Sequence, residues 1–538
     1  MADILLIQPP VRDFYLTAKR TIPYGLACIA SALSRSGFSV EIFDALATNK
    51  SRPLELPPEM AYLEPYYGTP DISPFGLFHG FRHFGYSFQH IGNIARASGA
   101  FLVGIASLFT AYSREAAETA RVVRQNLPGC AIVLGGHHPT ALPEASLSCG
   151  AADFAIRGEG EAALPLLAQA IRDGKGPESV PGIVFRKPGG GVRISPPAMM
   201  DHPDDYPLPA MNLVKQKFYR RKGRGSTVVT ASRGCPMKCS YCSVGASSLK
   251  YRRRSVDSVL REIDRAFADG DAGFIDFEDE NLSLNRDWFL ALLTGIRERF
   301  GEDGPELRAM NGLFAPSLDE TVIRAMKASG FRTLNLSLGS SSPAQLRRFR
   351  RPDVRPAVEQ AIALAEKYGM EAVCYIIVGA PGQQAGDSVD DLLWLAARKA
   401  LAGVSVFYPA PGSADYEKAE QSGLLPERFS LMRSSALPIS HTTTRCEAAT
   451  LLRLGRILNF IKQLRSRGEH LPEPVPCDAA IRLPADDRMA VGRHLLACFL
   501  HDGQIRGMTP KCEIFAHRIA PAVTERFLCG LRRLWPEI

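Results

Sequence analysis

Short apolar runs alternate with segments of helical periodicity along the first part of the chain. The apolar runs cover residues 4–8, 40–43, 102–106, 131–134 and 154–156. Residues 24–36 and 114–125, which lie between these runs, repeat their apolar positions every three or four residues, as an amphipathic helix does. Short apolar strands separated by helices predict a parallel, doubly wound sheet. Ligands of such sheets bind beyond the carboxyl ends of the strands.

A second series of the same kind begins near residue 227. Its apolar runs cover residues 227–231, 274–277, 307–310, 334–338, 373–378 and 404–408, with helical patterns between them. Six strand–helix repeats predict a partial parallel barrel. In such barrels the reactive groups gather where strands end and loops begin. The polar and glycine-rich clusters of this region all follow that rule, at residues 235–242, 278–281, 311–312, 339–342, 379–382 and 409–413.

Three further segments lie outside the two series. Residues 51–98 are rich in proline and then in aromatic residues, which indicates either a small satellite core or a cap over a large, flat cofactor. Residues 182–185 and 192–194 flank a Pro-Gly-Gly-Gly turn and predict a hairpin. Beyond residue 414 the pattern is mostly helical. One stretch has the spacing of a core-packing helix, with apolar positions at Leu451, Leu454, Leu458, Ile461 and Leu464.

These patterns divide the chain, whose 538 residues exceed one ordinary domain and suggest roughly two to four. We expect an α/β protein with a doubly wound, Rossmann-like domain, an aromatic insertion, a linker, a partial (β/α)6 barrel and a mostly helical C-terminal region. The expected ranges are 1–200 for the first domain with its insertion at 51–98, 201–222 for the linker, 223–415 for the barrel and 416–538 for the C-terminal region.

Composition places the chain among globular proteins, with 46% hydrophobic and 22% charged residues. No apolar run approaches the length of about 18 residues that a membrane span needs, so no membrane contact is expected. The N-terminus carries Asp3 where a signal peptide would be basic, and it is interpreted as a strand rather than a targeting segment. Twelve cysteines in so long a chain do not suggest a disulfide framework, and free thiols suit a cytoplasmic location.

The net charge of +8 is unevenly distributed, because no acidic residue occurs from Tyr206 to Val256. That stretch is either a solvated basic surface or an electropositive setting for an anionic cofactor or substrate. No aromatic-basic recognition motif accompanies the charge, so a nucleic-acid partner is not favoured. The basic residues are Lys215, Lys217, Arg220, Arg221, Lys222, Arg224, Arg233, Lys238, Lys250, Arg252, Arg253 and Arg254.

Three cysteines in this basic stretch, Cys235, Cys239 and Cys242, form a C-x-x-x-C-x-x-C run. Three thiolates on one short loop can hold three corners of an iron–sulfur cube. Such a cube usually takes four cysteines, and no fourth lies nearby, so one iron would keep an open position for chemistry. Zinc sites usually pair their ligands as two C-x-x-C halves, which this run does not do.

The cysteine run, with Tyr241 before its last cysteine, resembles the signature of the radical S-adenosyl-L-methionine (SAM) superfamily. The resemblance implies a 4Fe–4S cluster on the three cysteines, whose open iron chelates the amino and carboxylate groups of SAM. One electron from an external donor, such as a flavodoxin or a ferredoxin-like protein, then cleaves SAM to a 5′-deoxyadenosyl radical. By the same resemblance, Cys235, Cys239 and Cys242 are the metal-ligating and catalytic residues, and Tyr241 is a cofactor contact.

Looser matches suggest where SAM lies. The resemblance implies that Glu278 and Asp279 hold the SAM amino group and that Ser337, at the end of the fourth strand, contacts the ribose. The glutamate that is common in this fourth-strand region is absent here. Gly379 fits the adenine-contacting fifth strand, because glycine allows close backbone approach. The arginines 252–254 either reach the SAM carboxylate or lie on the surface.

The first domain resembles the cobalamin-binding domain that precedes the barrel in one branch of this superfamily. Four ordered stretches carry the resemblance: residues 23–26, 104–108, 134–140 and 157–161. They imply that small residues at strand ends admit the nucleotide tail of cobalamin, with contacts from Ser107, Thr110, Gly135, Gly136 and His137. Residues 9–15 lack the D-x-H-x-x-G motif that supplies a cobalt-ligating histidine in related domains, so we expect cobalamin without a histidine below the cobalt.

Together these resemblances indicate a cobalamin-dependent radical SAM enzyme acting on a small-molecule substrate. The favoured reaction is methyl transfer to an unactivated carbon or phosphorus centre. The alternatives that stay open are a cobalamin-dependent rearrangement, cyclisation or oxidation, a methylthiotransferase, and a non-catalytic cobalamin sensor. A methylthiotransferase normally brings three more cluster cysteines, and Cys28, Cys130 and Cys149 do not resemble that set.

Overall fold

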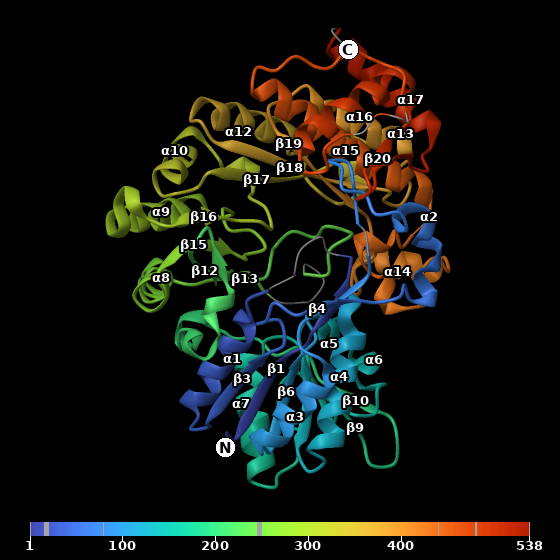
Figure 1. Ribbon diagram of the computed structural model, residues 1–538. Coiled ribbons are helices and arrows are strands. Elements are labelled where there is room, and N and C mark those ends of the chain that lie inside the picture. Colours follow the sequence, from blue (N-terminus) through green and yellow to red (C-terminus); the bar gives the residue numbers. More distant parts are fainter. Residues whose placement is uncertain are drawn as a thin grey trace.

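The computed structural model describes residues 2–14, 21–78, 80–244, 250–439, 441–478, 481 and 483–536. A sheet domain with the N-terminus occupies the lower half of Figure 1, and the barrel lies above it, from its first helices at the left to its last helix at the upper right. The C-terminal helices lie at the upper right, together with part of the N-terminal insertion, coloured blue in Figure 1.

The sheet domain is doubly wound around seven strands in the order β10-β9-β8-β7-β6-β1-β3. Its parallel strands are β3 (Val40–Asp44), β1 (Ile4–Gln8), β6 (Leu102–Ala106), β7 (Ala131–Gly135) and β8 (Phe154–Ile156). The predicted hairpin adds two antiparallel strands at one edge, β9 (Ile183–Arg186) and β10 (Val192–Ile194). The doubly wound α/β fold predicted for this domain is therefore confirmed.

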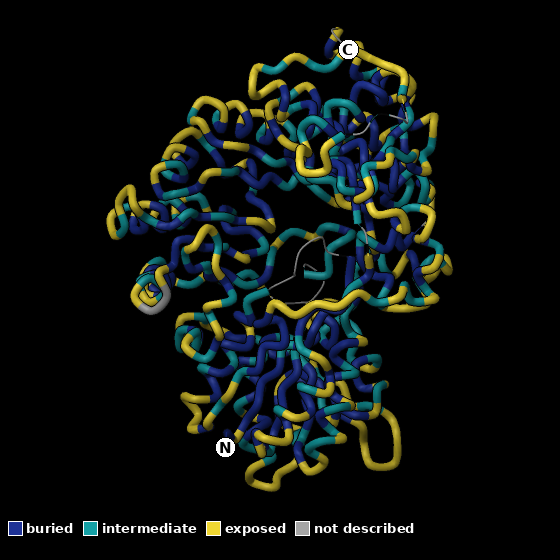
Figure 2. Tube along the Cα trace, viewed as in Figure 1, coloured by how far each residue is buried: buried dark blue, intermediate teal, exposed yellow. Residues whose placement is uncertain are grey.

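The apolar strands are buried because helices cover both faces of the sheet. Side chains alternate along β1, so Ile4 and Leu6 join one core while Leu5 and Ile7 join the other. Helices α1 (Tyr24–Arg35) and α7 (Gly160–Arg172) pack on the first of these faces, and α3 (Phe88–Ser98) and α4 (Ser113–Asn126) pack on the second. Figure 2 shows the buried residues running along the strands, between more exposed helices.

The barrel contains six parallel strands, as the alternating pattern predicted. The first three are β12 (Arg224–Val229), β15 (Ala272–Phe277) and β16 (Glu306–Arg308), and the others are β17 (Thr333–Gly339), β18 (Glu371–Val378) and β19 (Leu401–Val406). Bridges at Leu307–Phe331 and Leu313–Leu336 join the two groups of strands. The helices that lie between the described strands are α8 (Val256–Gly270), α9 (Arg286–Phe300), α10 (Glu320–Ala328), the short α11 (Pro343–Arg348), α12 (Arg355–Lys367) and α13 (Ala385–Ala396).

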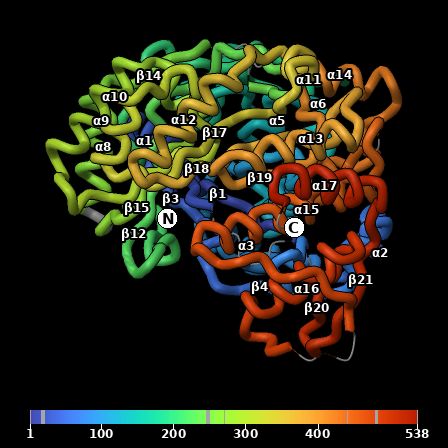
Figure 3. Tube along the Cα trace, turned by 90° about the horizontal axis from the view of Figure 1, so that it is seen from above, coloured from blue at the N-terminus to red at the C-terminus, as the bar shows by residue number. Residues whose placement is uncertain are grey.

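The C-terminal region is mostly helical, as predicted, and packs on the end of the barrel. Its elements are α14 (Ala414–Gln421), α15 (Arg445–Ser466), α16 (Arg488–Asp502), the hairpin of β20 (Arg506–Met508) and β21 (Ile514–Ala516), and α17 (Pro521–Leu534). Helix α15 contacts β19, and both α15 and α17 contact α13. In the view of Figure 3, α8, α9 and α10 lie together on one side of the molecule, whereas α15 and α16 lie on the other. The apolar positions predicted for α15 are all buried.

The aromatic insertion joins the core of the C-terminal region. Met60, Leu63, Tyr67 and Phe75 belong to the same buried cluster as the barrel and the C-terminal helices. Asp71 pairs with His517 at 2.8 Å, so polar contacts reinforce this packing. The last part of the range 51–98 is α3, a covering helix of the sheet domain. In the part of the chain that the structure describes, no helix combines the length and the apolar character needed to cross a membrane.

Candidate functional site

A cavity of about 280 Å³ begins at the carboxyl ends of the sheet strands and extends to the first loop of the barrel. Its walls include Leu6 of β1, Gly104 of β6 and Gly135 of β7. Strand order reverses between β1 and β6, and ligands of doubly wound sheets bind at such a switch point. On the barrel side the cavity is lined by Arg233, Gly234, Val244 and Glu280, which flank or lie close to the cysteine loop. One cavity thus connects both predicted cofactor regions.

Three glycines lie at the sheet end of this cavity, where Gly135 leaves room for a ligand and Gly136 and Gly104 allow close packing within the protein. A Cβ on Gly135 would meet no atom within 4 Å, so its missing side chain opens directly into free space. Gly136 has φ +128, and a Cβ there would lie 2.6 Å from the carbonyl oxygen of Ser107. A Cβ on Gly104 would lie 2.7 Å from Cδ2 of Leu6. The open space at Gly135 fits the entry of a nucleotide tail between strand ends.

The predicted cobalamin contacts divide between two cavities. Gly135, Gly136 and His137 line the cavity that leads to the cysteine loop. Ser107 lines a second, larger cavity, and its buried hydroxyl oxygen has no hydrogen-bond partner among the described residues. Thr110 lies within 3.3 Å of Nδ1 of His138, and His138 also faces the second cavity. The sequence does not show which of these residues face which cavity, because all of them come from the same two loops.

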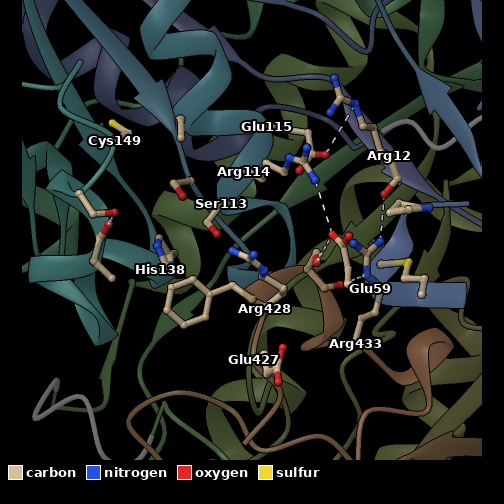
Figure 4. Close-up of a pocket in the computed structure, with 18 of the residues that line it drawn as sticks. Arg12, Glu59, Ser113, Arg114, Glu115, His138, Cys149, Glu427, Arg428 and Arg433 are labelled. Carbon is tan, nitrogen blue, oxygen red and sulfur yellow. Dashed lines mark hydrogen bonds and ion pairs between the residues drawn. The ribbon is translucent and has the colours of Figure 1, made fainter. Parts of the chain in front are cut away.

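The second cavity has a volume of about 1330 Å³ and lies between the sheet domain, the insertion and the segment 427–433 (Figure 4). Most of its charges are already paired. Arg114 lies 3.5 Å from Glu59, and Arg433, which also lines it, forms a 3.0 Å ion pair with Asp13. Burial raises the pKa of Glu115, on the same wall, to about 7. Arg233 and Gly234, which directly precede Cys235, line the first cavity and do not line this one.

The cysteine loop begins and ends in a short antiparallel pair, β13 (Ser232–Arg233) and β14 (Arg252–Arg253). Cys235, Cys239 and Cys242 are all half-buried. Burial is the main cause that raises the pKa of Cys235, and the other two thiols add to it, whereas the backbone N–H of Met237 donates a hydrogen bond that favours the thiolate. The three thiols therefore lie close enough together for the charges of Cys239 and Cys242 to affect the pKa of Cys235.

The cysteine loop offers three thiols as candidate ligands of an iron–sulfur cluster. In the part of the chain that the structure describes, no group of three His, Cys, Asp or Glu side chains that could hold one metal ion occurs. A cluster separates its ligands, since each thiolate binds a different iron. Tyr241 is tied down beside the loop, because its hydroxyl accepts a 2.8 Å hydrogen bond from Arg351 and its ring packs edge-on against Phe349.

The three acidic residues that follow β15, Glu278, Asp279 and Glu280, lie in three different environments. Asp279 is buried, and both its oxygens accept hydrogen bonds from the backbone N–H of Ala231 at 3.1 Å. Burial raises the pKa of Asp279 to about 6. Glu278 is exposed and accepts a 3.3 Å hydrogen bond from Asn311. Glu280, which the sequence analysis did not single out, lines the cavity beside Arg233.

The later strand ends are held by their own hydrogen bonds. The carbonyl oxygen of Ser337 accepts a 2.7 Å hydrogen bond from Arg351, which therefore links the fourth strand to Tyr241. Gly379 has φ +72 immediately after β18, where its nearest neighbour beyond the adjoining chain would be Thr443. Arg351, like Glu280, was missed because no sequence signal distinguishes it from its neighbours, which here are three more arginines within residues 347–351.

The basic stretch is largely neutralised by acids from outside it. Glu306 lies within 4 Å of both Arg221 and Lys222. Arg254 pairs with Glu262 of α8, and its side chain is only 11% exposed. Arg252 pairs with Glu159 of the sheet domain at 2.7 Å. The first and last of the arginines 252–254 are therefore held in ion pairs within the protein.

Comparison with known proteins gives two family matches. The model of the radical SAM superfamily matches residues 229–395, and the model of the B12 binding domain matches residues 84–168. The first match spans the cysteine loop and most barrel strands. The second contains Ser107, Gly135 and Gly136 and ends within α7.

Similar proteins match over most of the chain. The uncharacterized methyltransferase PH0819 of Pyrococcus horikoshii is 26% identical over 439 residues, 78% of this chain and 84% of that protein. The cytidylyl-2-hydroxyethylphosphonate methyltransferase of Streptomyces wedmorensis is 24% identical over 424 residues, 72% and 75% of the two chains. The solved structure of TsrM from Kitasatospora setae, with cobalamin and a [4Fe–4S] cluster bound, aligns with a TM-score of 0.60 at 20% identity over 78% of each chain. At that identity the last comparison supports the fold.

Proposed function

Since this chain is a radical SAM enzyme with a cobalamin-binding domain, we propose that it transfers a methyl group to an unactivated carbon or phosphorus centre of a small molecule. The observation that carries the proposal is the cavity that reaches from Gly135 and Gly136 at the sheet to Arg233 and Gly234 at the cysteine loop. Methyl transfer of this kind would need the cluster and cobalamin sites to open onto one space for the substrate, and this cavity adjoins both regions. Both similar methyltransferases support the same reaction type.

The residues present fit the three cofactors. When bound, the 4Fe–4S cluster, SAM and cobalamin supply a 5′-deoxyadenosyl radical and a transferable methyl group. We assign Cys235, Cys239 and Cys242 to the cluster, and Gly135, Gly136 and His137 to the cobalamin side. The pKa of His137 is lowered by burial and by the neighbouring charge of Arg233, so its imidazole is neutral near pH 7.

The protein holds the cavity walls in place and keeps them largely apolar. Leu6, Leu26, Ile29 and Val133 line it from both strands and helices of the sheet domain. Excluding water protects reactive intermediates from side reactions. Asp279 fixes the start of the cysteine loop through Ala231 and Ser232, so we assign it to positioning. Among the three acids of this loop, Glu280 is placed to meet a cationic group in the cavity, and we propose it in place of Asp279 as the SAM-facing acid.

The same proposal expects a small-molecule substrate, a flavodoxin- or ferredoxin-like electron donor and a cytoplasmic location. Oxygen sensitivity of the cluster and free thiols suit a reducing compartment. The substrate is set by the cavity walls and not by the fold, since one fold serves many reactions.

Product analysis after anaerobic reconstitution tests this proposal. The protein is loaded with iron, sulfide and cobalamin and incubated with SAM and a low-potential reductant. We expect both S-adenosylhomocysteine, from methylation of cobalamin, and 5′-deoxyadenosine, from reductive cleavage. The Cys235→Ala, Cys239→Ala and Cys242→Ala variants should lose 5′-deoxyadenosine formation. Formation of 5′-deoxyadenosine without S-adenosylhomocysteine in the unaltered protein would contradict methyl transfer and favour a rearrangement, cyclisation or oxidation.

A further inference from the structure

Two ion pairs connect the two ends of the cysteine loop to one helix of the sheet domain. Arg233, in β13, and Arg252, in β14, are direct partners in the antiparallel pair from which the loop emerges. Their carboxylate partners, Glu161 and Glu159, lie two residues apart at the start of α7. The loop that carries Cys235 is therefore attached to the cobalamin-binding domain at both ends.

The Arg252–Glu159 pair has the geometry of a strong, oriented contact. Its two nitrogen–oxygen distances are 2.7 and 2.9 Å, one to each carboxylate oxygen. Such bidentate pairs fix orientation as well as distance. The side chains are only 11% and 5% exposed, so water competes little for them. Glu159 also accepts a 2.5 Å hydrogen bond from the backbone N–H of Met200, which fixes the carboxylate in turn.

The Arg233–Glu161 pair lies closer to the reaction cavity. Its nitrogen–oxygen distance is 2.8 Å, and the Glu161 side chain is 6% exposed. Arg233 and Glu161 both line the cavity, and Gly234 alone separates Arg233 from Cys235. Both carboxylates sit at the N-terminus of α7, where the helix dipole favours negative charge. The helix dipole therefore favours the charged form of both carboxylates, which is the form that pairs with the two arginines.

We propose that Glu159 and Glu161 are positioning residues that hold the cluster loop at a fixed place relative to cobalamin. This inference rests on the proposed function, because the distance between the two cofactors matters only if a methyl group passes between them. Methyl transfer from SAM to cobalt needs the SAM methyl group and the cobalt at a fixed distance and orientation. Small misplacements of reacting groups lower the rate strongly. Reductive cleavage of SAM depends on the cluster and SAM alone, so it does not need this attachment.

Glutamine variants separate the two reactions. Glu159→Gln and Glu161→Gln, singly and together, keep the shape of each side chain and remove its charge. In the double variant we expect methylation of cob(I)alamin by SAM to slow about tenfold, while 5′-deoxyadenosine formation stays within about twofold of the unaltered protein. Asp390→Asn is the matched control, since it breaks a 2.8 Å ion pair with Arg526 between α13 and α17 and touches neither the loop nor the sheet domain.

A spectroscopic measurement tests the attachment without relying on turnover. Pulsed EPR between cob(II)alamin and the reduced cluster reports the distance between the two centres. We expect a narrow distance distribution in the unaltered protein and in Asp390→Asn, and a broader or shifted one in the double glutamine variant with equal iron and cobalt contents. Arg252→Lys, which keeps the charge but not the bidentate contact, gives a milder test if the glutamine variants fail to fold.

The outcomes distinguish this inference from the proposed function. Unchanged distance distributions and rates in both the double glutamine variant and Arg252→Lys would overturn the positioning role. If the unaltered protein makes no methylcobalamin, the methyl-transfer proposal fails, whereas the EPR comparison still decides whether Glu159 and Glu161 hold the loop.

Discussion

Arg351 donates a 2.8 Å hydrogen bond to the hydroxyl of Tyr241, the residue directly before the last cluster cysteine. The same guanidinium donates to the carbonyl oxygen of Ser337 on the fourth barrel strand, and its charge also acts on Cys239. The cysteine loop, which is fixed to the sheet domain by Arg233 and Arg252, is therefore fixed to the barrel by Arg351.

Removal of Arg351 should loosen the cluster loop. Arg351→Ala leaves the Tyr241 hydroxyl and the Ser337 carbonyl without this partner, and hydrogen bonds to charged groups contribute about 1.5–3 kcal/mol each. We expect a lower midpoint of thermal unfolding and less iron retained per chain after reconstitution. Arg355→Ala removes a nearby arginine whose salt bridge, to Asp353, lies near the surface, and it serves as the control. Equal iron contents and midpoints in the two variants would show that Arg351 does not support the loop.

The glycines at the end of β7 give a matched pair for the cobalamin site. Gly135→Val adds a side chain that meets no protein atom near its Cβ but projects into the cavity. We expect this variant to fold normally and to retain several-fold less cobalamin. Gly136→Val should instead lower the unfolding midpoint, because φ is +128 there and its Cβ would contact the carbonyl of Ser107. Full cobalamin retention by Gly135→Val, measured by absorbance after gel filtration, would place cobalamin elsewhere.

The buried carboxyl of Glu115 predicts a specific dependence of stability on pH. Burial raises its pKa from 4.5 to about 7, so the folded state holds a proton that the unfolded state releases. Stability from this group is therefore fully present below about pH 4.5 and is lost as the pH rises through 7. The loss amounts to at most about 3 kcal/mol.

The variant Glu115→Gln tests this dependence. We expect the difference in unfolding midpoint between pH 5 and pH 7.5 to shrink in Glu115→Gln compared with the unaltered protein. Glu118→Gln, on the same helix and paired with the same Arg12, is the control. The prediction fails if Glu115→Gln keeps the full pH dependence of the unaltered protein.

The absence of a histidine from residues 9–15 predicts that no protein imidazole binds the lower face of cobalt. We expect the EPR spectrum of bound cob(II)alamin to lack the nitrogen splitting that an axial protein imidazole produces. His137 lies on the wall of the same cavity and is the residue that could change this result. A nitrogen splitting that disappears in His137→Ala would refute the expectation and assign the ligand.

The sequence was sufficient for the architecture, because periodicity and strand ends are local properties. All five parallel strands of the sheet domain and all six barrel strands overlap the apolar runs that predict them, although β12, β16 and β19 each end two residues earlier than expected. The loop residues then follow the rim rule of parallel barrels, which placed the cysteines, the acidic run and Gly379 at strand ends.

Side-chain directions and contacts between distant segments were not predictable in the same way. In the run Glu278-Asp279-Glu280, only the fold decides that Asp279 turns inward to Ala231 while Glu280 reaches the cavity. The aromatic insertion was predicted as a satellite core or a cap, but its side chains complete the core of helices some 400 residues later in the chain. The pairing of Arg252 with Glu159 depends on how two domains meet, and no local pattern records that.

The fate of the SAM methyl group tests the central claim most directly. The reconstituted protein, with its cobalamin reduced to cob(I)alamin, is mixed anaerobically with SAM that carries a trideuterated methyl group. The bound cobalamin is then extracted in the dark and analysed by mass spectrometry. A cavity shared by the two cofactors predicts trideuteromethylcobalamin approaching one equivalent per chain. Accumulation of 5′-deoxyadenosine with no labelled methyl group on cobalamin would contradict the account.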